Sequence, residues 1–138
     1  MSKRKSYRQP GWERQPVSWA YSVAFKKPRS GRLLWVSTDK QSETEASKEA
    51  QAVMAEHHPD SDYLEYGISK TYWRHWGGYN EQITEDEYEF ALEREQALDY
   101  LKKSRTEAEA RRRAERDGFV GSEEAWRSAW WDGMAYRR

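Results

Sequence analysis

Histidine and aspartate side chains gather in one short segment, and these residue types can ligate metals. His57 and His58 are followed closely by Asp60 and Asp62. Imidazole and carboxylate groups can hold zinc or manganese. Adjacent histidines near a helix end point in different directions, however, and no second cluster has recognisable ligand spacing. We therefore interpret the segment as a polar turn and predict no metal and no cofactor. A metal-dependent enzyme that uses His57, His58 and Asp60 is kept as a further alternative.

His75 could act as a general base, because imidazole exchanges protons near neutral pH. It stands between Arg74 and Trp76, with no evident nucleophile or carboxylate partner in the neighbouring sequence. The chain has no phosphate-binding glycine loop, no nucleophile elbow and no dinucleotide-binding fingerprint. We therefore predict that the protein is not an enzyme, and we assign no catalytic residue.

A group of aromatic and arginine residues surrounds a pair of glycines. Trp, Tyr and Arg dominate the hot spots of protein interfaces, and loops often carry function. We interpret residues 73–80 as an aromatic loop whose side chains either pack on each other or contact a partner. An arginine-rich part of a predicted long helix adds an electrostatic contact. The predicted partner-binding residues are Trp73, Arg74, Trp76, Tyr79, Arg111, Arg112 and Arg113.

Charge is distributed in blocks although the formal net charge is zero. Residues 1–36 carry nine Lys or Arg and one acid, whereas residues 37–101 carry five bases and sixteen acids. A basic block with aromatic residues nearby can follow a phosphate backbone and stack on bases. The alternative function is therefore DNA or RNA binding, provided that the fold separates the acidic block from the basic one. The residues predicted for it are Lys3, Arg4, Lys5, Arg8, Arg14, Lys26, Lys27, Arg29 and Arg32.

The elements around these groups alternate between strand and helix patterns. Large and small side chains alternate over residues 17–25, which predicts a strand with one bulky face. A short basic turn with Pro28 and Gly31 then favours an antiparallel hairpin. Ser42 begins a capping box, which predicts a helix start. The expected elements of this part are strands at 17–25 and 33–37, a helix at 43–57 and a strand at 62–72.

The C-terminal part predicts helices. A second capping box at Thr84 opens one long helical stretch over residues 85–117. Acid-first pairs at i,i+4 spacing stabilise its polar second half by roughly 0.2–0.5 kcal/mol each. These pairs are Asp99 with Lys103, Glu107 with Arg111, and Glu109 with Arg113. A last short helix from about residue 122 carries Trp126 and Trp130.

Together these patterns predict an α+β fold. A small three-stranded antiparallel sheet in β-β-α-β order, with one packed helix, precedes a long charged helix and a short C-terminal Trp-rich helix. The expected domains are a basic flexible N-terminal arm at 1–16, a ββαβ domain with the aromatic loop at 17–80, and a helical part at 81–138 that packs on it. With 8 Trp and 9 Tyr but 36% hydrophobic residues, rings must supply much of the core.

Composition also narrows the class of protein. No apolar run approaches the ~18 residues of a membrane span, and no signal-peptide core follows the basic start. The sequence has no cysteine, which fits a reducing compartment. We therefore expect a cytoplasmic location and no membrane contact. Because the second half of the long helix has no apolar side chain larger than Ala, a homo-oligomer through that helix is a further prediction.

Two resemblances bear on function. Residues 17–57, two strands and a helix with basic turns, loosely resemble the arm-binding domains of phage integrases, although the strand after the helix departs from that family's order. The whole chain, which is short, aromatic, highly charged and cysteine-free, resembles accessory proteins of bacteriophages and other mobile elements. That resemblance implies an anti-defence role in which the protein binds and inhibits a host protein or nucleoprotein complex. We therefore expect a non-enzymatic macromolecular interaction module.

Overall fold

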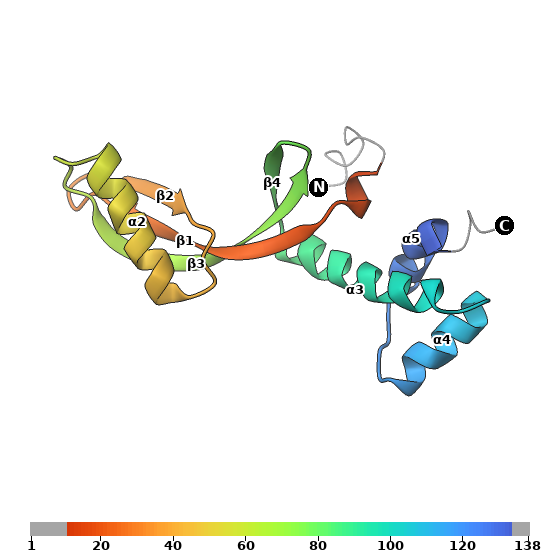
Figure 1. Cartoon of the computed structure of the whole chain (residues 1–138). Helices are drawn as coiled ribbons and strands as arrows, with labels where there is room; N and C mark the ends of the chain where they lie inside the picture. Colours follow the sequence, from red (N-terminus) through yellow and green to blue (C-terminus); the bar gives the residue numbers. More distant parts are fainter. Residues whose placement is uncertain (1–10, 134–138) are drawn as a thin grey trace. The chain divides into compact units, whose positions relative to one another are not determined.

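The chain folds as two compact units, shown by a computed structural model that describes residues 11–133 (Figure 1). The sheet unit spans residues 15–84, and the helical unit comprises residues 11–14 together with 85–133. Within the described residues, no helix is both long enough and apolar enough to cross a membrane. The elements are η1 Trp12–Arg14, β1 Val17–Lys26, β2 Leu33–Ser37, α2 Glu43–His57, β3 Leu64–Trp76, β4 Tyr79–Ile83, α3 Glu85–Lys102, α4 Glu107–Arg116 and α5 Glu123–Gly133.

The sheet has four antiparallel strands in the order β2-β1-β3-β4 (Figure 1). The predicted three-stranded sheet is therefore wrong, because the segment expected to be an aromatic loop is the end of β3 and the start of β4. Gly77 and Gly78 form a two-residue turn, and Gly77 adopts a φ of 59°. The backbone twist of a two-residue turn matches the twist of the strands that it joins. This turn places Trp76 opposite Tyr79. A pair of glycines between two aromatic runs was the signal for this hairpin.

Helix α2 covers one face of the sheet and forms its core. Its boundaries match the predicted helix, and the Ser42 side chain accepts a hydrogen bond from the Glu45 amide as predicted. The helix contacts the sheet through small residues, so that it approaches closely. Bulky strand residues fill the layer between them. The buried residues of this core are Val23, Phe25, Val36, Ala46, Ala50 and Met54.

The described part of the helical unit contains three α-helices, α3, α4 and α5, besides the short η1. The predicted single helix over residues 85–117 is therefore wrong, because it ends at Lys102 and a new helix begins at Glu107. Thr106 caps α4 by accepting a hydrogen bond from the Glu109 amide, and the Glu109 carboxylate accepts one from the Arg105 amide. These bonds satisfy amides that a continuous helix would have used internally, so the chain can turn here.

Alanine residues hold these helices close together. The second half of the predicted long helix does bury a face, since Ala110 and Ala114 are fully shielded beside Leu101 and Trp126. The argument for a homo-oligomer through an unsupported helix therefore loses its basis. All three predicted acid–base pairs are present, with N–O distances of 2.7–3.1 Å. Small buried side chains on one side and ion pairs on the other explain how so polar a helix is stabilised.

Candidate functional site

The two faces of the sheet differ in side-chain size and in what covers them. Tyr21, Val23 and Phe25 of β1 point to α2, whereas the small residues between them point away from it. Residues paired across neighbouring strands share a face, so the register defines the second face completely. We call this second face the open face. It carries Ser18, Ala20, Ser22, Ala24 and Lys26 of β1, Leu33, Trp35 and Ser37 of β2, Leu64, Gly67, Ser69, Thr71, Trp73 and His75 of β3, and Asn80 and Gln82 of β4.

One end of the open face presents large apolar side chains to solvent. Leu33 and Trp35 are 47% and 51% exposed, and Leu64 is 63% exposed. Tyr66, at the irregularity between β1 and β3, is 62% exposed, and the Lys26 ammonium lies 4.6 Å from its ring centre. These four side chains, the aromatic patch, are half of the eight large hydrophobics that are exposed among the described residues. Most of the exposed large hydrophobic side chains of the sheet unit therefore lie at this end of the open face.

Small residues leave room beside the Trp35 ring. Ala24 is directly opposite Trp35, and Gly67 follows on the next strand. A Cβ atom added at Gly67 would have no atom within 4 Å. A cavity of about 330 Å³ lies beside the indole, large enough for a flat ring system. It is lined by Ser22, Trp35, Ser37, Ser69, Lys70, Thr71 and Gln82.

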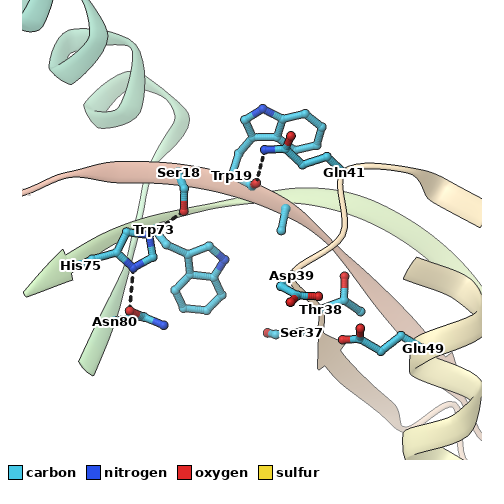
Figure 2. A pocket seen from close by; sticks show the side chains of 11 residues that line it. Ser18, Trp19, Ser37, Thr38, Asp39, Gln41, Glu49, Trp73, His75 and Asn80 are labelled. Atoms are coloured by element: carbon cyan, nitrogen blue, oxygen red, sulfur yellow. Dashed lines mark hydrogen bonds between the residues drawn. The ribbon is translucent and has the colours of Figure 1, made fainter. Parts of the chain in front are cut away.

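A second cavity, of about 380 Å³, lies near the other end of β1 and contains a chain of hydrogen bonds (Figure 2). The Ser18 hydroxyl is 2.6 Å from His75 Nε2, and His75 Nδ1 is 2.6 Å from Asn80 Oδ1. Because Oδ1 can only accept, Nδ1 carries the proton and Nε2 accepts from the serine hydroxyl. The order of groups is that of a nucleophile, a base and an orienting residue. The structure thus supplies His75 with the neighbours that the sequence did not reveal.

The structure divides the predicted aromatic contact group between the two faces of the sheet. Trp73 lies on the open face, where its indole N–H donates to Thr71. Arg74 points the other way, is 2% exposed and donates to the Gln15 carbonyl. Trp76 is half-buried on the same face as Arg74, opposite the open face. Its partner on β4 is Tyr79, which is 70% exposed. These four residues therefore do not form one surface, and Arg74 has almost no area to offer a partner.

The predicted arginine contact is largely engaged within the helical unit. Arg111 donates to Glu107 and Glu123, and its guanidinium carbon lies 5.1 Å from the centre of the Trp126 ring. The hydrogen bond to Glu123, together with that to Glu107, raises the pKa of Arg111, and the same bond lowers the pKa of Glu123. Arg113 pairs with Glu109, while Arg112 is exposed.

The cations predicted for nucleic acid fall into three places. Lys3, Arg4, Lys5 and Arg8 lie outside the described residues. Arg14 donates to Asp132 in the helical unit, at 3.3 Å. The other four are at the turn between β1 and β2, and among residues 11–133 no carboxylate lies within 4 Å of their nitrogens. We call these four the turn cations: Lys26, Lys27, Arg29 and Arg32.

The histidines at the end of α2 lie apart from one another's contacts. His57, His58 and Asp60 are all exposed. His57 lies 3.4 Å from Glu56, and the His58 ring packs edge-on against Tyr63. Within the described part of the chain, no group of three or more potential ligands comes together. This geometry matches the interpretation of the segment as a polar turn.

Comparisons with protein-family models, with curated proteins and with solved structures found no match to this chain. The residues that sequence reasoning overlooked are Trp35, Gly67 and Tyr66, which it treated only as parts of strands. The available signal was the run of small residues on β1, since small side chains opposite a bulky core face leave space on the second face.

Proposed function

We propose that this chain is a non-enzymatic interaction module that captures a macromolecular partner on the open face of its sheet. The observation that supports this proposal is the aromatic patch, in which four large side chains, each at least 47% exposed, lie together on one face. Large apolar side chains that gather in solvent on one face are uncommon on soluble domains and mark interaction sites. Trp and Tyr are also the side chains that dominate binding hot spots.

The sheet also suits binding because it holds the patch in place before a partner arrives. Trp35 and Leu33 belong to β2, which is paired along its length with β1. Leu64 begins β3, which is paired with β1 through ten residue positions. A preorganised surface loses little conformational entropy when it binds, so more of the contact energy remains as affinity.

The proposal includes the partner class expected from the sequence, a host protein or nucleoprotein complex in the cytoplasm. Binding at a preformed aromatic surface would block whatever the partner contacts with the same region. The inhibitory, anti-defence consequence stays a prediction, and it is tested by adding the purified protein to the captured complex and measuring that complex's activity.

A matched pair of tryptophan variants tests the proposal. Trp35 is 51% exposed on the open face, and Trp131 is 58% exposed on α5 of the helical unit. We expect the Trp35→Ala variant to lose capture of the partner from a native-cell extract, and the Trp131→Ala variant to retain it. Circular dichroism checks that both variants stay folded. Loss of capture with Trp131→Ala and not with Trp35→Ala would move the binding surface to the helical unit and refute the proposal.

One observation favours a second candidate function, ester hydrolysis, at the Ser18–His75–Asn80 chain. Ser18 Oγ would attack the carbonyl carbon as its proton passes to His75 Nε2, which then protonates the departing alkoxide; water later releases the acyl group from Ser18. The Trp19 carbonyl accepts from Gln41, and in an antiparallel strand the N–H of a residue points the same way as its carbonyl. The Trp19 N–H is thus a donor for the oxyanion on the cavity side.

The hydrolysis candidate has a direct test with p-nitrophenyl acetate. It predicts a burst of nitrophenol that disappears with Ser18→Ala and persists with Ser69→Ala, a serine on the same face in another strand. Mass spectrometry would locate the acetyl group on Ser18. Equal hydrolysis by the wild type and the Ser18→Ala variant would exclude this function.

A further inference from the structure

We infer that the open face binds single-stranded nucleic acid, with one unstacked base on the Trp35 ring and the phosphate backbone on the turn cations. The inference rests on the proposed function, because it names the partner of the same surface. It differs from the prediction made from the sequence, which relied on the N-terminal arm and on charge. The observation that supports the inference is the cavity beside Trp35. The distribution of charge along the chain gave no sign of such a cavity.

The cavity has the size and the polarity that a nucleobase requires. Its volume is about 330 Å³, and one wall is an indole that is half exposed. Hydroxyl and amide groups of Ser37, Ser69 and Gln82 line the same space and can bond to the edge of a base. Aromatic side chains stack on bases of any sequence, because every base has a π-face. The site therefore fits a flat polar heterocycle better than an aliphatic side chain.

The turn cations lie at the end of the face where the backbone of such a ligand would pass. Lys26 is on the open face, two residues along β1 from Ala24, the partner of Trp35, and four residues from Ser22, which lines the cavity. Four residues of a strand span about 13 Å. Lys26 and Lys27 lie over the rings of Tyr66 and Tyr63. Arg29 and Arg32 are exposed, and among the described residues no carboxylate lies within 4 Å of their nitrogens, so these two are available to phosphate. Cations together with an exposed ring beside a cavity match a ligand that carries both phosphates and flat bases, as single-stranded nucleic acids do.

The fold also keeps part of the acidic block away from the open face. Glu65 is on the α2 side of the sheet, where it accepts hydrogen bonds from Ser47 and Gln51. The acidic residues of α2 belong to the element that covers that opposite face. Within the sheet unit, Lys26 and the acidic residues of α2 thus occupy different faces, whereas Lys27 lies over the Tyr63 ring on the α2 side. The sequence made nucleic-acid binding conditional on this separation.

Single strands are favoured over duplexes by the geometry of the ring. A base can stack on Trp35 only when it has left its neighbours, and bases in a duplex are already stacked. Tyr66 offers a second exposed ring on the other side of β1, with the Lys26 ammonium 4.6 Å from its centre. Two rings and a cation on neighbouring strands suit a flexible strand with exposed bases.

Ser69 provides a variant that fills the cavity without removing a charge or a ring. Ser69 lines the cavity, so the larger side chain of Ser69→Leu would occupy the space beside Trp35. We expect this variant of the full chain to bind fluorescent oligo-dT at least 10-fold more weakly than the wild type, as the loss of a stacked base implies. Its salt dependence should be unchanged, because the phosphate contacts remain.

Two further variants complete the test by fluorescence anisotropy. Arg32→Ala should weaken oligo-dT binding and reduce the slope of log affinity against log salt by about 0.7, as expected for one lost contact to a single strand. Trp131→Ala should bind as the wild type does. A duplex of matched length should bind more weakly than oligo-dT. Thermal melting confirms that each variant is folded.

The outcomes separate this inference from the proposed function. Absence of oligo-dT and oligo-U binding at low salt overturns the inference, while Trp35-dependent capture of a protein would leave the proposed function standing. Binding that Ser69→Leu and Trp35→Ala leave intact also overturns it, because the ligand would then lie elsewhere on the chain. If Trp35→Ala affects neither nucleic acid nor protein capture, both proposals fail together.

Discussion

The sheet unit and the helical unit contain the same residue types, tryptophan, arginine and alanine, but use them differently. In the helical unit Trp126 is 3% exposed and packed among alanines. In the sheet unit Trp35 also stands beside small residues, yet it is 51% exposed. The difference is that the alanines of the helical unit lie between helices, whereas Ala24 and Gly67 lie on a face that α2, the helix of residues 15–84, does not cover.

The comparison shows that small residues have two opposite effects on a large neighbour. Between two helices they allow close approach, so that a ring is enclosed from several sides. On a sheet face that no helix covers, small residues leave one side of a neighbouring ring in solvent and make space beside it. Arginines follow the same logic, since Arg94 is buried with Asp132 in the helical unit while Arg29 and Arg32 are exposed at the turn of the sheet unit.

The largest expected effect comes from removing a ring in each unit. Trp126→Ala should destabilise the helical unit by about 3–5 kcal/mol, because it leaves a cavity among buried alanines and Leu101. Trp35→Ala should change the unfolding free energy by about 0.5 kcal/mol or less, as for a surface substitution. Urea titration followed by circular dichroism measures both. Similar losses for the two variants would show that Trp35 is a core residue.

A glycine in each unit gives a second, smaller contrast. A Cβ at Gly133 would lie 2.8 Å from the Leu101 Cβ, so Gly133→Ala should cost about 1–3 kcal/mol through overpacking. Gly67→Ala meets no atom within 4 Å and should leave the unfolding free energy within about 0.5 kcal/mol of the wild type. The same urea titrations apply. A Gly133→Ala protein as stable as the wild type would mean that α3 and α5 can separate at no cost.

The helix caps test whether the break between α3 and α4 depends on one side chain. Thr106→Ala removes the hydrogen bond to the Glu109 amide and should cost about 1 kcal/mol. Ser42→Ala removes the matching bond at the start of α2 and should cost a similar amount in the sheet unit. Amide hydrogen exchange locates each loss. If Thr106→Ala increased protection over residues 103–106, the two helices would have merged.

The smallest effect concerns pH and the helical unit. A backbone hydrogen bond from Arg105 lowers the pKa of Glu109, and a hydrogen bond from Arg111 lowers the pKa of Glu123. Since the folded values lie below the ordinary 4.5, this stabilisation is complete above about pH 4.5 and is lost as the pH falls through the folded values. The melting temperature of the Glu123→Gln variant should therefore fall less steeply with decreasing pH than that of the wild type. An unchanged pH dependence of the melting temperature would contradict the assignment.

Local patterns in the sequence predicted much of the fold. Side-chain period predicted the strands at 17–25 and 33–37. Side-chain period together with the Ser42 cap predicted the helix at 43–57. The hairpin at Gly77 and the break before Thr106 were missed although their signals are also local. In each case a stronger pattern, an aromatic cluster or a long charged run, was given precedence over the turn or cap residues.

The candidate site was much less predictable. His75 was noted, but its partners Ser18 and Asn80 come from two other strands. Arg74 was chosen as an exposed contact and is buried, because the residue after Trp73 in a strand must point to the opposite face. Trp35 drew no attention, since nothing within β2 shows that its neighbours across the sheet are Ala24 and, beyond it, Gly67.

The sequence by itself determined the periods, caps and charge blocks, and with them where most strands and helices begin and end. Only the tertiary structure decided which face of the sheet α2 would cover, and so which rings are core and which remain exposed. The reason is physical: periodicity and capping are set by interactions within a few residues of chain, whereas the exposure of a side chain is set by atoms that come from distant segments.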